Sequence, residues 1–189
     1  MRRKLMEQCY SNCERLRHLL NDVSLITRLE EGSLLIPKEK VCLNDIVGEM
    51  KNEIDLLPQD NKMQLHIDIH EPIDIYGNKS LITSVFRNLT ENALAYSEGK
   101  HIYIAAHDLK NSYIEVIFED DGVGVDDVHL QRLFDRFYRV DKGRSRKLGG
   151  TGLGLSIVKH AVRFHGGDIA VMHSLRGGLK YIFTLKKTD

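Results

Sequence analysis

The hydrophobic and polar positions of the chain follow two different periods. Residues 1–31 carry apolar side chains at spacings of three and four, with charged side chains opposite, which predicts one long amphipathic helix. The stripe contains Leu5, Cys9, Leu16, Leu19, Val23 and Ile26. Gly32 stands where such a helix would end. The stripe must be buried against the rest of the chain or against a second copy, and we favour pairing in a coiled coil or bundle.

Shorter patterns follow. Alternating apolar residues predict strands at 41–43, 64–69, 73–76, 101–106, 113–119, 169–172 and 179–185. Helical periodicity predicts helices at 44–57, 78–96, 127–133 and 156–164. Asn44 or Asp45 is expected to cap the first of these. Pro37 marks a boundary, so we predict two parts, residues 1–36 and 37–189.

Composition narrows the class of protein. The 189 residues suffice for one substantial core plus an appendage, and 27 basic residues balance 27 acidic ones, which argues against nucleic-acid binding. No apolar run approaches the ~20 residues of a membrane span, and no signal peptide is visible. Cys9, Cys13 and Cys42 are interpreted as reduced thiols, although Cys9 and Cys13 are spaced as a metal or redox pair would be. We expect a soluble cytoplasmic fragment.

Polar residues interrupt two of these elements. Asn88, Asn92 and Tyr96 follow one another at intervals of four on the shoulder of the apolar face of helix 78–96. They are either satisfied polar groups of the core or the lining of a cleft over the sheet. Asp120 directly follows strand 113–119, where it either serves a site or forms a turn before glycine.

A glycine-rich stretch precedes the last helix. Residues 149–155 read Gly-Gly-Thr-Gly-Leu-Gly-Leu, after the basic segment 141–147. Free backbone N–H groups and the positive end of a helix dipole suit a phosphate there, and nearby lysines and arginines add charge-assisted bonds. The alternative is a tight strand-to-helix turn.

Four motifs now stand in order. They are Asn88 and Asn92 with Tyr96, then Asp120-x-Gly122-x-Gly124, then Phe134-x-x-Phe137, then Gly150-Thr151-Gly152-Leu153-Gly154. This series resembles the ATP-binding catalytic domain of sensor histidine kinases, with its asparagine, first glycine, phenylalanine and second glycine boxes. The resemblance covers about residues 41–185, and residues 15–32 resemble the second helix of the dimerisation and phosphoacceptor hairpin. It implies an α+β fold of the Bergerat type: a two-layer α/β sandwich with a mixed sheet of about five strands and three helices, preceded by one long amphipathic helix.

The resemblance also implies roles for residues that bind ATP and Mg²⁺. Asp120 would accept the adenine amino group, Gly122 and Gly124 would let the backbone pass close to the base, and Tyr96 would pack near the adenine or ribose. Asn92 would hold Mg²⁺, and Asn88 would orient a phosphate or the metal shell. The phosphates would meet the second glycine box, residues Gly150, Thr151, Gly152, Leu153 and Gly154. Phe134 and Phe137 would anchor a flap from which Arg139, Lys142 and Arg144 could reach the phosphates.

Three departures qualify the resemblance. His18 and His70 do not fit the family's phosphoacceptor motif, so this fragment is expected to bind ATP without phosphorylating itself. Ala95 stands where the family often has lysine, which removes one phosphate contact. Asn88 stands where ATP-hydrolysing relatives carry a glutamate base; an amide cannot act as a general base, which favours transfer to a histidine. Glu91 adjoins Asn92 but points elsewhere on a helix, and we interpret it as a solvated or auxiliary group.

The expected function is therefore an ATP-dependent protein-histidine kinase. Its γ-phosphoryl acceptor would be a histidine on its own phosphoacceptor helix, outside this fragment, and the phosphate would pass to an aspartate of a response-regulator receiver domain. The full-length protein is expected to be a homodimer anchored in a membrane. The alternatives are an ATP-hydrolysing switch of the same fold and a nucleotide-binding dimerisation module without turnover.

Overall fold

A computed structural model describes residues 2–30, 36–58, 62–109, 112–141 and 150–188. The helices are α1 (Arg2–Glu30), α2 (Leu43–Asp55), α3 (Lys79–Asn92), α4 (Asp127–Leu130) and α6 (Gly154–Phe164), and a π-helix, η2 (Ala93–Ser97), continues α3. The strands are β1 (Glu39–Cys42), β2 (Gln64–Asp68), β3 (Asp74–Gly77), β4 (His101–Leu109), β5 (Tyr113–Asp120), β6 (Ile169–His173) and β7 (Leu179–Lys186).

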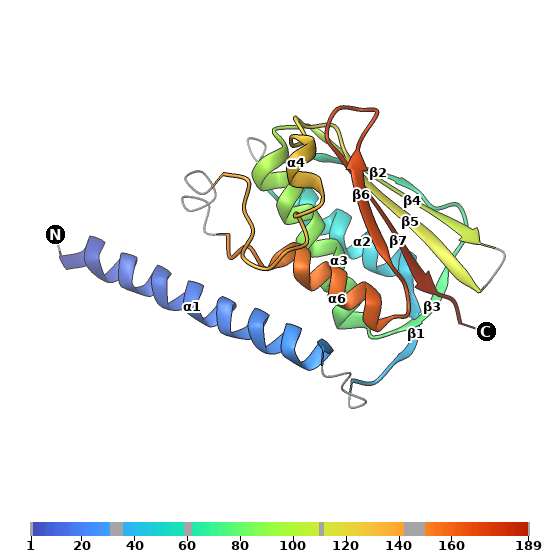
Figure 1. The fold of residues 1–189 in the computed structure, drawn as a ribbon, viewed down its shortest axis with the longest axis horizontal. Helices are drawn as coiled ribbons and strands as arrows, with labels where there is room; N and C mark the ends of the chain where they lie inside the picture. Colours follow the sequence, from blue (N-terminus) through green and yellow to red (C-terminus); the bar gives the residue numbers. More distant parts are fainter. Residues whose placement is uncertain (1, 31–35, 59–61, 110–111, 142–149, 189) are drawn as a thin grey trace.

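The main sheet has five strands in the order β2-β4-β5-β7-β6. The β2–β4 pair is parallel and the other three pairs are antiparallel, so the sheet is mixed, as predicted. Helices α2, α3 and α6 cover one face of it and leave the other open, as Figure 1 shows. The two-layer α+β architecture is thus confirmed. The strand predictions did not show that β1 and β3 leave this sheet and pair with each other in a separate antiparallel ribbon.

The core lies between the sheet and the helices. Alternate residues of β5, namely Ile114, Val116 and Phe118, are fully buried because they point toward the helical layer. Phe86 of α3 meets Phe183 of β7 edge-on, with ring centroids 5.8 Å apart. Burial of each such side chain contributes about 1.5–3 kcal/mol, so this layer fixes α3 on the sheet.

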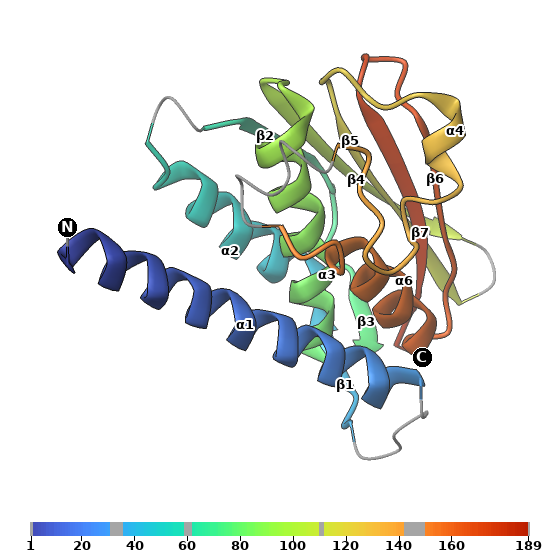
Figure 2. The same cartoon turned by 60° about the vertical axis from the view of Figure 1, so that its left-hand side comes forward.

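The long helix α1 is a single element, as predicted, and its C-terminal half packs on α6 (Figure 2). The predicted stripe is only partly covered within one copy of the chain, where Leu16 and Val23 are 59% and 44% exposed. Leu19 and Ile26 of the stripe face the domain together with Leu29, and Ile26 and Leu29 are buried. Among the described residues, no helix combines the length and apolarity that crossing a membrane requires.

The helix that carries the asparagines departs from the predicted 78–96 span. Asn78 caps it, with its side-chain oxygen accepting a hydrogen bond from Leu81 N at 3.0 Å. The α-helix ends at Asn92 and the chain continues as the π-helix η2. A π-turn holds more residues than an α-turn. Although Tyr96 follows Asn92 by four residues, it therefore does not lie directly in line with Asn88 and Asn92 along the helix.

Two smaller boundaries also differ. Helix α2 begins at Leu43, so neither Asn44 nor Asp45 caps it. The side-chain oxygen of Asn44 accepts a hydrogen bond from Ile73 N at 3.0 Å and ties the start of α2 to the loop before β3. Helix α4 is shorter than predicted and ends at Leu130.

Candidate functional site

Asp120 ends β5 with its side chain buried on the helical side of the sheet, at 4% exposure. Its Oδ1 accepts a hydrogen bond from Gly122 N at 3.0 Å, and its Oδ2 accepts one from Leu179 N at 3.2 Å. The first bond is the local turn expected of Asp before glycine, whereas the second reaches a different strand. Each carboxylate oxygen keeps a further lone pair for an external donor.

Burial raises the pKa of Asp120 above its ordinary range. The two backbone N–H groups act in the opposite direction because they stabilise the ionised form, and the neighbouring carboxylates of Asp121 and Glu119 add to the increase. A buried acceptor, oriented by two backbone donors, is suited to select a ligand that presents a hydrogen-bond donor.

The first glycine box contacts the end of helix α3–η2. Val123 N donates to the carbonyl of Ser97 at 2.8 Å, and Gly122 packs against the same carbonyl. Tyr96, one residue earlier, is half-buried. Gly124 lies against the backbone of the turn between β6 and β7. Asp120 and Tyr96 are therefore brought to the same end of the helix.

Asn88 lies farther back along α3, where α6 begins. Its amide NH₂ donates to the carbonyl of Ser84 at 2.8 Å and to the Ser84 hydroxyl at 3.2 Å. A Cβ at residue 154 would lie 2.6 Å from Asn88 Oδ1, so only glycine fits this contact. Asn92, one turn later, is half-buried.

The second glycine box forms the entry to α6, which begins at Gly154 rather than at the predicted Ser156. Thr151 Oγ1 accepts a hydrogen bond from Leu153 N at 3.2 Å within this turn. Phe137 N donates to the carbonyl of Gly152 at 2.8 Å, which joins the phenylalanine box to the turn.

The two phenylalanines hold the flap base in different ways. Phe134 packs edge-on against Tyr181, with ring centroids 6.5 Å apart. The ring of Phe137 is 60% exposed, so Phe137 contacts the glycine-rich turn through its backbone N–H.

Arg139 follows this region. Its Nη2 is buried and has no hydrogen-bond partner within the described part of the chain. An unpaired, buried guanidinium nitrogen fits an anionic ligand atom. Lys142 and Arg144, the other predicted phosphate contacts, fall outside the described residues.

The predicted residues are thus distributed along one helix. Gly122, which is bonded to Asp120, meets its end at Ser97, while Gly154 meets it at Asn88. The nine residue steps from Asn88 to Ser97 span at most about 13 Å, because the α-helical rise applies only as far as Asn92 and the π-helix η2 is more tightly wound along its axis. One elongated ligand can therefore contact both ends.

Sequence reasoning missed the contribution of α1. Asp22 Oδ2 accepts a hydrogen bond from Thr151 Oγ1 at 3.3 Å, and burial raises the pKa of Asp22. Glu30, the last residue of α1, pairs with Arg136, and its Oε1 lies 3.6 Å from His160 Nε2. Asp22 lies between Leu19 and Ile26, which face the domain.

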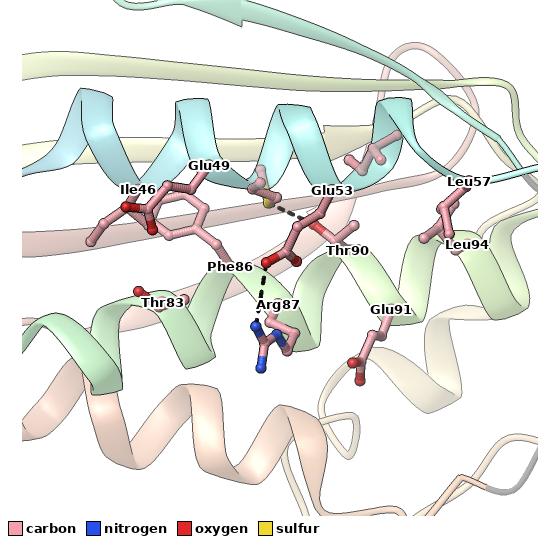
Figure 3. A pocket seen from close by; sticks show the side chains of 12 residues that line it. Ile46, Glu49, Glu53, Leu57, Thr83, Phe86, Arg87, Thr90, Glu91 and Leu94 are labelled. Atoms are coloured by element: carbon pink, nitrogen blue, oxygen red, sulfur yellow. Dashed lines mark hydrogen bonds and ion pairs between the residues drawn. The ribbon is translucent and has the colours of Figure 1, made fainter.

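A separate hollow of about 150 Å³ lies on the other side of α3, between α2 and α3. Figure 3 shows its apolar floor around Phe86 and the ion pair of Arg87 with Glu53, 3.5 Å apart, at its rim. Glu91 lines this hollow, as its predicted orientation away from Asn92 requires. None of the predicted binding residues lines it, so it is distinct from the site along α3.

Comparison with known proteins gives the family. Residues 77–189 match the model of the histidine kinase-, DNA gyrase B-, and HSP90-like ATPases. The chain belongs to this family. The matched span contains all four motifs, and the resemblance to sensor histidine kinases is confirmed by relatives of that name.

The sensor histidine kinase CusS of Escherichia coli K12 is 31% identical over 186 residues, which are 97% of this chain but 38% of that protein. The chain therefore spans well under half of this relative. Among solved structures, the histidine kinase AdeS of Acinetobacter baumannii aligns with a TM-score of 0.77 and 20% identity, over 98% of this chain and 85% of that one. Full-length ShkA in complex with AMPPNP aligns at a TM-score of 0.82 and 20% identity, over 98% of this chain and 39% of that one. These two likenesses extend the shared fold to α1.

Proposed function

We propose that the chain binds ATP along α3 and donates its γ-phosphoryl group to a histidine on a docked helix outside residues 1–189. The observation that carries this proposal is the buried carboxylate of Asp120, held by backbone donors at 3.0 and 3.2 Å with lone pairs to spare. Adenine offers an amino donor to such an acceptor. A hydrogen bond to a charged group contributes about 1.5–3 kcal/mol, enough to select the base.

The phosphates would lie at the other end of α3. The turn of residues 150–154 opens the 11-residue helix α6 and presents its N-terminal N–H groups and dipole there. Arg139 Nη2, which has no partner among the described residues, supplies a further donor. The separation of at most about 13 Å along α3 and η2 lets a base occupy one end and a triphosphate the other.

Mg²⁺ would be held through the side-chain oxygen of Asn92, on the face of α3 that also carries Asn88. Amide oxygen is a hard ligand of the kind that Mg²⁺ accepts, and this ion usually keeps several waters and takes further ligands from phosphates. When bound, it would neutralise charge on the phosphates.

The chain's own contribution to phosphoryl transfer would be positioning and electrostatics. Asp120 fixes the base, and the turn before α6 orients the phosphates for in-line attack. Asn88 orients a phosphate but has no basic group with which to activate water. Transfer to a histidine is therefore favoured over hydrolysis, the main alternative.

The partners would be those of a two-component kinase: its own phosphoacceptor helix, a second copy of the chain and a response-regulator receiver domain. Leu16, Leu20 and Val23 of α1 are exposed and apolar, which supports helix pairing between two copies. We accordingly propose residues 1–36 as the dimerisation part and 37–189 as the ATP-binding part of a longer protein.

Calorimetric titration with Mg-ATP tests the site. Asp120→Asn should weaken binding at least tenfold, because an amide offers only one acceptor where the carboxylate offers two. Asp121→Asn is the matched control, since Asp121 bonds to the backbone N–H groups of Lys100 and His101 instead. Equal affinity in the Asp120 variant and the unaltered chain would refute the adenine role.

Turnover is tested by adding a separate acceptor-helix fragment to the chain and Mg-ATP. Phosphohistidine on that fragment supports the proposal. Free phosphate alone would instead identify a hydrolysing switch. Nucleotide binding with neither product would identify a binding module without turnover.

A further inference from the structure

The turn between β6 and β7, residues 174–178, lies against the Asp120 carboxylate. Leu179 N, at its end, donates to Asp120 Oδ2. Gly178 packs so closely that a Cβ there would collide with Asp120 Oδ1. The position of this turn therefore decides which lone pairs of the carboxylate, and which backbone donors, face a bound base.

Glu119, the preceding residue of β5, holds the same turn from the open face of the sheet. Its Oε1 accepts a hydrogen bond from Ser174 Oγ at 2.6 Å, and Ser174 Oγ in turn accepts one from Arg176 N at 2.8 Å. The Glu119 side chain is only 13% exposed. Two adjacent residues of one strand thus hold the turn from opposite faces.

Arg176 extends this arrangement across the sheet. Its Nε lies 3.7 Å from Glu119 Oε2, and its guanidinium lies 3.9 Å over the ring of Tyr103. Tyr103 of β4 stands directly opposite Glu119 in the β4–β5 register and stacks on His66 of β2, with centroids 4.7 Å apart. The turn is therefore fixed to three strands of the main sheet.

We propose that Glu119, Ser174 and Arg176 are positioning residues that set the purine selectivity of the nucleotide site. This inference rests on the proposed ATP site and specifies its selection of the base. While these residues hold the turn in place, Leu179 N–H donates to Asp120. That donor is therefore not available to a ligand. Guanine carries a carbonyl where adenine carries its amino group; a released turn would free Leu179 N–H to donate to that carbonyl.

The test measures the dissociation constants of Mg-ATP and Mg-GTP, together with the thermal midpoint, for the intact chain and its variants. Ser174→Ala removes both hydrogen bonds of the hydroxyl and should lower the preference for ATP over GTP about fivefold. Ser174→Thr keeps the hydroxyl and should restore the preference. Thr184→Val is the matched control, because Thr184 Oγ1 accepts a hydrogen bond from Asp168 N at 3.1 Å at the far end of the same hairpin.

The ratio of the two constants separates positioning from stability, since partial unfolding weakens both nucleotides by the same factor. An unchanged ratio in Ser174→Ala, whatever its thermal midpoint, would overturn the inference. Should that variant not fold, Arg176→Ala replaces it, because the Arg176 side chain is 51% exposed. Suppose that Asp120→Asn weakens Mg-ATP binding but the ratio of the Mg-ATP and Mg-GTP dissociation constants stays constant in the Ser174 and Arg176 variants. Only this inference then fails. If the unaltered chain binds no ATP, the proposed function fails as well.

Discussion

The carboxylate of Asp22 on α1 accepts a hydrogen bond from the hydroxyl of Thr151 in the glycine-rich turn, at 3.3 Å. Ile26, one turn later on α1, packs with Leu153 and Ile157 at the start of α6. The long helix therefore contacts the segment that we propose to hold the phosphates. It brings a negative charge to that segment, which opposes a triphosphate.

Asp22→Asn should raise the affinity for Mg-ATP, since the amide can still accept the bond from Thr151 but carries no charge. We expect an increase of about two- to fivefold at low salt, the range of a partly exposed charge interaction. The gain should shrink as salt screens the charge. Calorimetry at two salt concentrations measures both effects.

Asp45→Asn is the control for this change in net charge, because Asp45 is exposed in the first turn of α2. It should leave the affinity as it was. An Asp22 variant that binds Mg-ATP no better than the unaltered chain at low salt would show that this carboxylate does not oppose the nucleotide.

Much of the architecture followed from local patterns. Period-two alternation located the strands of the main sheet, because one face of that sheet is buried and the other open. The motif order also indicated which residues would converge, and the contacts of Asn88 with Gly154 and of Gly122 with Ser97 bring them to one helix.

What the sequence pattern missed depends on contacts between distant segments. Apolar residues occupy more than one side of α1, so periodicity alone could not show that the side with Asp22 packs on α6. The π-helix at Ala93–Ser97 differs from an α-helix by hydrogen-bond register, which residue types do not specify. Glu119 looked like an ordinary outward residue of a strand, because its partners Ser174 and Arg176 lie more than fifty residues away.

The contact between Gly154 and Asn88 provides a second prediction. Gly154→Ala places a methyl group 2.6 Å from Asn88 Oδ1 and must displace that amide. We expect the free energy of unfolding to fall by about 1–3 kcal/mol, as for overpacking of a close contact, and Mg-ATP binding to weaken as well. Chemical denaturation and calorimetry measure the two effects.

Gly48 offers the matched control. It lies within α2, and a Cβ there would have no heavy atom within 4 Å. Gly48→Ala should therefore stabilise the chain by about 0.4–1 kcal/mol through the helix propensity of alanine and the unfolded state, with no change in nucleotide affinity. Equal effects of the two substitutions would refute a special role for the Gly154 contact.

His165 provides a prediction about pH. It is 3% exposed; its Nε2 accepts a hydrogen bond from Asn78 N at 2.9 Å, and its Nδ1 pairs with the carbonyl of Ala161 at 2.6 Å. These partners require the neutral ring with its proton on Nδ1. Burial lowers the pKa of His165 below its ordinary value of 6.5, a trend that the charge of Lys38 reinforces and the Ala161 carbonyl opposes.

The unfolded chain therefore binds a proton at a higher pH than the folded chain does. The contribution of His165 to stability is fully present above about pH 6.5 and is lost as the pH falls from there through the lower pKa of the folded state, with a slope of up to about 1.4 kcal/mol per pH unit. Denaturation between pH 7.5 and 5 should show this loss. His165→Gln, whose amide keeps a donor and an acceptor, should flatten that part of the profile. A slope that persists unchanged in the His165 variant would assign the pH dependence to other groups, because only a group that titrates differently in the two states can produce it.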